Sequence, residues 1–216
     1  RAFRREDLAA GERELLDSVD RMLAKRAAAA SIQRSALRAT KTLPQPLIDA
    51  VFESLQEQGR VRAGSQGQML FQDRLRPLGL AEQQRLDAIV ALCEQQPFRP
   101  PDRAEIEAHV GATGDALSGL LDRGCDEGRL ERVGEHFYAH KALRTALHAI
   151  RRNCLAHADA LDIPALRDEL DTSRKYLIPL LEHVDSLGLT VLRGGTRRLL
   201  ASSDLNRDLA GDSPAG

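Results

Sequence analysis

Two basic clusters near the C-terminal end of the chain contain the residue types that bind phosphate. The first is Ser173-Arg174-Lys175, which follows Asp171 and Thr172 and precedes an apolar helical pattern. Asp, Thr and Ser are typical N-cap residues, so we expect a helix to begin here with free backbone N–H groups and a positive dipole end. Cations at that end oppose the helix dipole, whereas a bound phosphate would reverse this cost. The alternative is an ordinary N-cap without a ligand.

The second cluster surrounds a glycine turn. Arg193 precedes Gly194 and Gly195, and Arg197 and Arg198 follow them. Arginine forms bidentate and stacking contacts, and glycine lets the backbone approach a ligand closely. The pattern predicts a basic hairpin tip, which is either a ligand-binding wing or a solvated turn.

The elements that must position these clusters recur along the chain. Gly59, Gly128 and Gly188 are spaced 69 and 60 residues apart. Apolar residues before each glycine follow helical spacing, and the glycine suits the left-handed position that ends a helix. Two short segments joined by a glycine-containing turn follow each glycine and indicate a β-hairpin.

Two further helical patterns precede each unit, which is the plan of a winged helix. The predicted fold class is mainly α with small β-hairpins, as a tandem array of three winged-helix domains. The expected limits are an N-terminal lead (1–9), a winged helix (10–79), an acidic winged helix (80–140), a third winged helix with both basic clusters (141–201) and a disordered tail (202–216).

Composition and charge narrow the possible functions. The 216 residues carry a net charge of −1, distributed as +4 in residues 1–80, −6 in 81–140, +3 in 141–200 and −2 in 201–216. An acidic middle repels a polyanion, so a nucleic-acid contact belongs to a flank. Aromatic residues make up only 3%, which argues against a base-stacking sheet. No apolar run is long enough to span a membrane, and no secretory leader opens the sequence.

The sequence contains no pattern typical of a catalytic or metal site. Phosphate-binding, nucleotide-binding, hydrolase and zinc-protease motifs do not occur. Three widely spaced cysteines suit reduced thiols. His136 and His140 have a metal-like spacing with Cys125 upstream, but without a paired cysteine motif we expect no metal site.

Residues 166–200 closely resemble the C-terminal winged helix of the bacterial selenocysteine-specific translation elongation factor, the SelB family. The matching residues are Asp171-Thr172-Ser173-Arg174-Lys175-Tyr176, Pro179-Leu180-Leu181-Glu182, Asp185 and Gly188-Leu189-Thr190. Residues 81–140 resemble the preceding winged helix of that family through Gly128–Tyr138 and the Ala139-His140 that follow, and residues 10–79 resemble the one before, more weakly.

The resemblance implies binding of a hairpin in selenoprotein mRNA, the selenocysteine insertion element. The implied RNA-binding residues are Ser173, Arg174, Lys175, Arg193, Gly194, Gly195, Arg197 and Arg198. It further implies a cytoplasmic monomer that reaches the ribosome and selenocysteinyl-tRNA through a full-length protein. The GTPase, with its GTP and Mg, lies outside this chain, so no catalysis and no cofactor are expected here.

The wing departs from the family pattern. Val191 and Leu192 stand where the family commonly has two arginines, and the turn is one residue longer, so the pattern leaves open which arginine faces RNA. Two other functions also stay open. A DNA-binding regulator would read the major groove with a third helix, although apolar residues follow Tyr176 immediately. A protein-interaction scaffold suits the acidic middle but leaves both basic clusters without a role.

Overall fold

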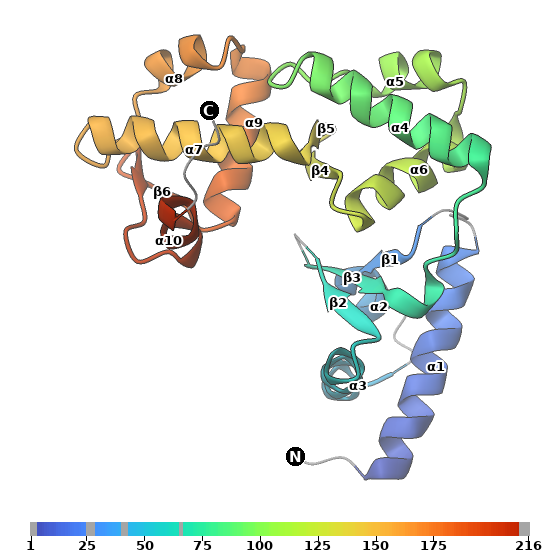
Figure 1. The fold of residues 1–216 in the computed structure, drawn as a ribbon. Coiled ribbons are helices and arrows are strands. Elements are labelled where there is room, and N and C mark those ends of the chain that lie inside the picture. The colour runs from blue at the N-terminus through green and yellow to red at the C-terminus, as the bar shows by residue number, and fades with distance from the viewer. Residues whose placement is uncertain (1–3, 25–28, 40–42, 65–66, 212–216) are drawn as a thin grey trace. The chain divides into compact units, whose positions relative to one another are not determined.

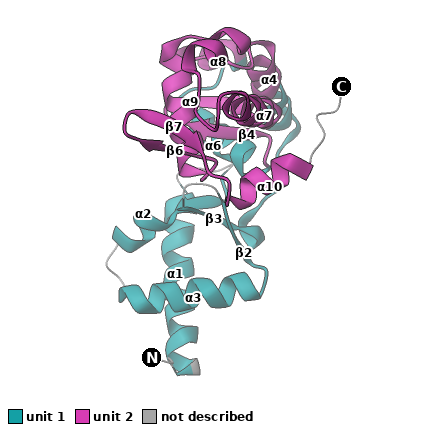
Figure 2. Cartoon of the chain, turned by 90° about the vertical axis from the view of Figure 1, so that its left-hand side faces the viewer, with its two compact units in different colours: residues 1–87, 110–127 teal, residues 88–109, 128–216 magenta. Residues whose placement is uncertain are grey.

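The computed structural model describes residues 4–24, 29–39, 43–64 and 67–211 (Figure 1). The fold is of the winged-helix type, mainly helical with short antiparallel strand pairs. The chain divides into two compact units, which Figure 2 colours separately: residues 1–87 with 110–127, and residues 88–109 with 128–216. The chain passes from one unit to the other inside helices α4 (Leu80–Gln95) and α5 (Arg103–Val110) and again between residues 127 and 128, not at the predicted limits near residues 79 and 140. The three-domain count therefore stays a prediction.

The first unit contains a small sheet with helices. Its other elements are α1 (Arg5–Leu23), β1 (Ser31–Gln33), α2 (Arg34–Ala39), α3 (Gln45–Glu57), β2 (Val61–Ala63), β3 (Gln68–Phe71), the 3₁₀ helix η2 (Gln72–Arg74) and α6 (Gly114–Asp126). The strands are antiparallel in the order β1-β3-β2.

Helix α3 forms as the repeat pattern predicts. Pro46 stands in its first turn, where the missing N–H costs nothing, and Ile48, Phe52 and Leu55 are buried on one face. Gly59 follows the helix with φ +70°, so the expectation of a left-handed glycine at the helix end is confirmed.

The start of the first unit differs from the predicted pattern. Helix α1 begins at Arg5, inside the predicted lead, and ends at Leu23, ahead of the four consecutive alanines at positions 27–30. Ala29 and Ala30 are buried and not helical, whereas Ala27 and Ala28 lie outside the described residues. Strand β1 was not predicted, because three residues are too few for a recognisable alternation; its partner is β3.

The second unit contains two hairpins and a run of helices. Besides its parts of α4 and α5 it holds β4 (Leu130–Val133), β5 (His136–Ala139), α7 (His140–Ala156), α8 (Ile163–Glu169), α9 (Arg174–Ser186), β6 (Thr190–Arg193), β7 (Thr196–Leu199) and α10 (Asp204–Gly211). Strands β4 and β5 form one antiparallel pair, and β6 and β7 form another. Both predicted hairpins of this part of the chain are therefore confirmed.

One core joins these elements. Apolar residues of α7, α8 and α9 pack with Leu189 and Leu199 of the last hairpin, and Val133 and Tyr138 of the preceding hairpin belong to the same cluster. The segment before α8 extends the last hairpin, because the N–H of Leu161 donates to the carbonyl of Arg197 at 2.9 Å. This bond fixes the position of β7 against the helices.

Two helix ends in this unit carry the residue types that favour them. The Asp162 carboxylate accepts a hydrogen bond from the backbone N–H of Ala165 at 3.0 Å and caps α8, with Pro164 in its first turn. Gly188 ends α9 with φ +78°. The Asp162 cap thus marks the start of α8, and Gly188 marks the end of the basic helix α9 before its hairpin.

The predicted disordered tail is wrong for residues 204–211, which form α10. Leu209 is 3% exposed and belongs to the core of the second unit. Asn206 accepts a hydrogen bond from Arg151 of α7 at 2.8 Å. The polar composition of the tail concealed the pair Leu205 and Leu209, whose four-residue spacing gives a helix one apolar face. Residues 212–216 lie outside the described part of the chain.

In the described residues, no helix combines the length and apolar character needed to cross a membrane.

Candidate nucleic-acid interface

The predicted start of the basic helix is confirmed. Helix α9 begins at Arg174, and Ser173 occupies the N-cap with extended backbone angles, φ −120° and ψ 166°. The Ser173 side chain makes no capping hydrogen bond. Within the described residues, the N–H groups of Arg174 and Lys175 also have no acceptor. The helix start therefore presents unused donors, which are the groups that bind an anion.

The charges at this helix start favour a polyanion. Arg174 and Lys175 are exposed, and the first turn of α9 contains no acidic residue. Among the described residues, neither side chain forms an ion pair, and the Lys175 Nζ lies 5.0 Å from the centroid of the Tyr176 ring. Two cations thus stand at the positive end of a helix dipole without compensation from the protein.

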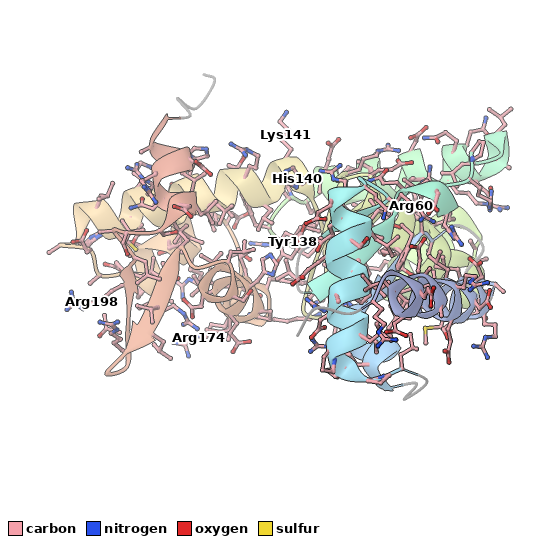
Figure 3. All side chains as sticks on the ribbon, turned by 90° about the horizontal axis from the view of Figure 1, so that it is seen from below. Arg60, Tyr138, His140, Lys141, Arg174 and Arg198 are labelled. Atoms are coloured by element: carbon pink, nitrogen blue, oxygen red, sulfur yellow. The ribbon has the colours of Figure 1, made fainter. Side chains whose placement is uncertain are left out.

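The register of the β6–β7 hairpin, which we call the wing, separates its arginines. Val191 faces Arg198 and Leu192 faces Arg197 in neighbouring cross-strand pairs. Successive residues of a strand point to opposite faces, so Arg193 and Arg198 share one face and Arg197 lies on the other. Figure 3 labels Arg174 at the start of α9 and Arg198 on the wing, both in the second unit.

Arg197 belongs to the interior. Its side chain is 9% exposed, and its Nε donates to Oδ2 of Asp185 on α9 at 2.9 Å. Asp185 also accepts a hydrogen bond from the hydroxyl of Thr190. The expectation that Arg197 is part of an exposed basic surface is therefore wrong, because Arg197 instead joins the wing to α9.

Arg193 and Arg198 keep their predicted exposure. Within the described residues, neither forms an ion pair. Gly194 and Gly195 between the strands have φ +56° and +80°, a pair of values that a tight two-residue hairpin requires. Among the described residues, no atom beyond each glycine and its chain neighbours lies within 4 Å of the position that a Cβ would take there, so the tip has room for a ligand.

The two apolar residues at the departure from the family wing lie at different depths. Leu192 is 53% exposed, and Val191 is half-buried. The cross-strand register places Leu192 on the face of Arg197, opposite to Arg193 and Arg198. An exposed apolar side chain at this place suits contact with an unpaired base or a sugar better than contact with phosphate.

The preceding hairpin, β4–β5, packs against α9. The rings of His136 and Tyr176 have centroids 5.1 Å apart, and a Cβ on Gly134 would lie 3.4 Å from that of Pro179. Tyr176 is half-buried. The turn of this hairpin accommodates the proline that interrupts the hydrogen-bond ladder of α9.

A buried histidine, His183, and a half-buried one, His136, mark this contact. The side chain of His183 is 2% exposed and lies 3.7 Å from Glu131 of β4. Burial lowers the pKa of His183, and the Glu131 charge opposes the shift. Burial also lowers the pKa of His136, and the nearby charge of Lys175 adds to it. Among the described residues, no three His, Cys, Asp or Glu side chains cluster closely enough to hold a metal ion.

Sequence reasoning missed one arginine beside the candidate site. Arg99, between α4 and α5, donates from Nε to the carbonyl of Asp171 at 2.7 Å and from Nη2 to its carboxylate at 2.5 Å. Arg99 stands in a polar, proline-containing stretch with no periodicity. No sequence signal connects it with a residue 72 positions later.

Comparisons with known proteins agree with the predicted resemblance. Residues 153–199 match the family model described as elongation factor SelB, winged helix. This segment, which contains α8, α9 and the wing, is therefore a winged helix of the SelB type, and the resemblance is confirmed for it.

Solved structures of low identity are also similar. The mRNA-binding domain of elongation factor SelB from E. coli, solved in complex with SECIS RNA, is 19% identical with a TM-score of 0.48; the match covers 56% of this chain and 98% of that one. A bacterial selenocysteine-specific elongation factor EF-Sec is 17% identical with a TM-score of 0.46; the match covers 89% of this chain and 30% of that one. No curated protein matches the chain.

Proposed function

We propose that this chain binds an RNA hairpin through the start of α9 and the outer face of the wing, which is the face that carries Arg193 and Arg198. The observation that carries the proposal is the uncompensated positive charge of Arg174 and Lys175 at a helix start with unused N–H donors. This start lies inside the segment that matches the SelB winged helix. A phosphate there accepts hydrogen bonds, neutralises two cations and interacts favourably with the dipole.

The ligand is the loop of a hairpin. A-form RNA hides its base edges in a deep, narrow groove, so proteins that read RNA sequence bind unpaired bases. Four exposed cations, Arg174, Lys175, Arg193 and Arg198, form a small set that suits a compact loop better than a long duplex. Leu192 is an exposed apolar residue on the opposite face of the wing.

The finer proposal follows the family. The hairpin is the selenocysteine insertion element of a selenoprotein mRNA, and the chain is the C-terminal part of a cytoplasmic, monomeric elongation factor. The last of three tandem winged helices binds the RNA, and the other two act as a spacer between the RNA and a GTPase, which delivers selenocysteinyl-tRNA to the ribosome at in-frame UGA codons. Tethering raises the local concentration of this tRNA at the decoding site. The chain itself binds and does not catalyse, so it needs no cofactor.

Fluorescence anisotropy tests the proposal. The ligands are a selenoprotein hairpin from the same genome, the same hairpin with a scrambled loop, and duplex DNA of equal length. We expect tight binding to the native loop alone. Equal or tighter binding to DNA would instead favour a transcription regulator. Absence of binding to all three would favour a protein-interaction scaffold.

A further inference from the structure

The segment between α4 and α5 forms hydrogen bonds with Asp171 and Thr172, which precede α9. Besides the two hydrogen bonds from Arg99 to Asp171, the Thr172 hydroxyl donates to the carbonyl of Phe98 at 2.5 Å. Thr172 is buried, and Phe98 packs against the core of the second unit. Two neighbouring residues of this segment thus fix the two residues before Ser173.

Asp171 adopts a conformation that needs support. Its φ is +43°, in the left-handed region that residues with a Cβ rarely occupy. It stands three residues before Arg174, so its backbone angles set the direction in which the chain enters α9. Arg99 contacts both the carbonyl and the carboxylate of Asp171, and it stabilises this conformation from two sides.

The charge of Asp171 gives Arg99 a second effect. The Asp171 side chain is 90% exposed and close in sequence to the start of α9, where the proposed phosphate binds. An unpaired carboxylate at this place would repel that phosphate. The Arg99 guanidinium neutralises it.

We propose that Arg99 is a positioning residue for RNA binding: it holds Asp171 in the left-handed conformation and thereby orients Ser173, Arg174 and Lys175 toward the RNA loop. This inference rests on the proposed function. Arg99 acts through Asp171 and does not contact the RNA. Glycine reaches a positive φ without support, so an Asp171→Gly variant makes the dependence on Arg99 testable.

A double-mutant cycle in the full chain provides the test. We expect Arg99→Ala to weaken binding of the native hairpin by about five- to tenfold, a typical coupling for residues in contact. In the Asp171→Gly background the same Arg99→Ala change should have less than about a twofold effect, because glycine needs no support. Arg103→Ala, which removes an exposed arginine paired with Glu107 in the same part of the chain, is the matched control and should leave affinity unchanged.

The salt dependence of binding separates positioning from direct contact. Arg99→Ala should leave the slope of log K against log salt unchanged, whereas loss of a phosphate contact reduces it by about one. An equal loss of affinity in both backgrounds with a reduced slope would make Arg99 an RNA contact and overturn the inference. Unchanged affinity in Arg99→Ala would overturn it while the proposed function stands. A wild-type chain that does not distinguish the native from the scrambled loop would overturn both.

Discussion

Alternation along a single strand decides which basic side chains of the wing face outward. Arg197 and Arg198 are neighbours in sequence, yet one is buried against Asp185 and the other is exposed. The sequence predicts a basic hairpin tip but does not reveal which face of a four-residue strand packs against α9. That choice depends on the pair Arg197–Asp185, whose members are 12 residues apart. The resemblance to the family identifies the arginines of the wing, whereas the register of β6 and β7 shows which of them is exposed and which is buried.

Replacement of Arg174 tests the helix start. We expect Arg174→Ala to weaken hairpin binding by about 1–3 kcal/mol, or roughly 5- to 150-fold in Kd, because it removes one of two cations beside the unused N–H groups. Anisotropy titrations measure the change. Arg207→Ala, an exposed arginine of α10 paired with Asp204, is the control for loss of surface charge. Equal affinity of the Arg174→Ala variant and wild type, with folding intact, would remove the helix start from the interface.

Arg197 and Arg198 should give opposite phenotypes. Arg197→Ala leaves a partly buried Asp185 carboxylate with only the Thr190 hydroxyl, so we expect a loss of about 1–3 kcal/mol in the free energy of unfolding. Arg198→Ala should keep that free energy within about 0.5 kcal/mol and weaken RNA binding instead. Urea unfolding and anisotropy on both variants measure the two quantities. A stable Arg197→Ala variant with weak RNA binding would show that the assignment of the faces is wrong.

At the scale of elements, α9 contacts two hairpins. The wing follows it in the chain and joins it through Asp185 and Arg197, while β4–β5 packs near Tyr176, Pro179 and His183. The basic helix is thus fixed along its length, and its start alone is left with unused donors. A helix held in this way can present a phosphate site without rearrangement, which reduces the cost of binding.

The buried His183 predicts a pH dependence of stability. Its pKa in the folded protein is below its usual value of 6.5, so the unfolded chain takes up a proton more readily as the pH falls. We expect the free energy of unfolding to be constant above about pH 7.5 and to fall through pH 6.5 and below. His183→Gln should reduce this pH dependence of the free energy of unfolding. Part of the dependence should remain in that variant, because the pKa of His136 is lowered as well.

Two measurements check this expectation. Urea unfolding between pH 5 and 8 gives the free energy, and an NMR titration gives the imidazole pKa of His183 directly. An imidazole pKa above 6.5, or stability that rises as the pH falls, would contradict the assignment. His109→Gln, outside the contact between α9 and β4–β5, is the control.

Elements with a local signal are predictable, and those that depend on distant partners are not. Helices α3 and α9 follow from apolar spacing and from a left-handed glycine after the helix, and a hairpin follows each of them. Helix α8 follows from its capping Asp162. Strand β1 exists because β3 offers it a hydrogen-bonding edge. Helix α10 exists because a core far upstream accepts Leu209. The contact of Arg99 with Asp171 likewise depends on tertiary structure that no local pattern encodes.

Helix α10 should contribute to stability. Leu209→Ala removes a buried side chain from the core of the second unit, so we expect a loss of about 2–5 kcal/mol in the free energy of unfolding. Leu205→Ala, at a partly buried position of the same helix, should cost less. Thermal or urea unfolding of both variants measures this. Wild-type stability of Leu209→Ala would mean that residues 204–211 behave as the disordered tail that their composition predicts.

At the scale of the whole molecule, the positions of the charges matter more than the net charge. The net charge of −1 gives no general attraction for polyanions, and the acidic residues 81–140 oppose non-specific binding. Within the described part of the chain, Arg174, Lys175, Arg193 and Arg198 are exposed and form no ion pair. Affinity must therefore come from a few local contacts, and the acidic part of the chain favours a specific loop over bulk RNA.

This placement predicts a shallow salt dependence for hairpin binding. Four exposed cations, Arg174, Lys175, Arg193 and Arg198, carry the proposed phosphate contacts. Each contact contributes about −0.7 to −0.9 to the slope of log K against log salt, so we expect a slope of about −3. Anisotropy titrations from 50 to 300 mM salt measure it, and Arg198→Ala should reduce its magnitude by about one. A slope much steeper than this would mean that cations elsewhere in the chain bind RNA, and a slope near zero would mean that apolar contacts, such as those of Leu192, dominate the interface.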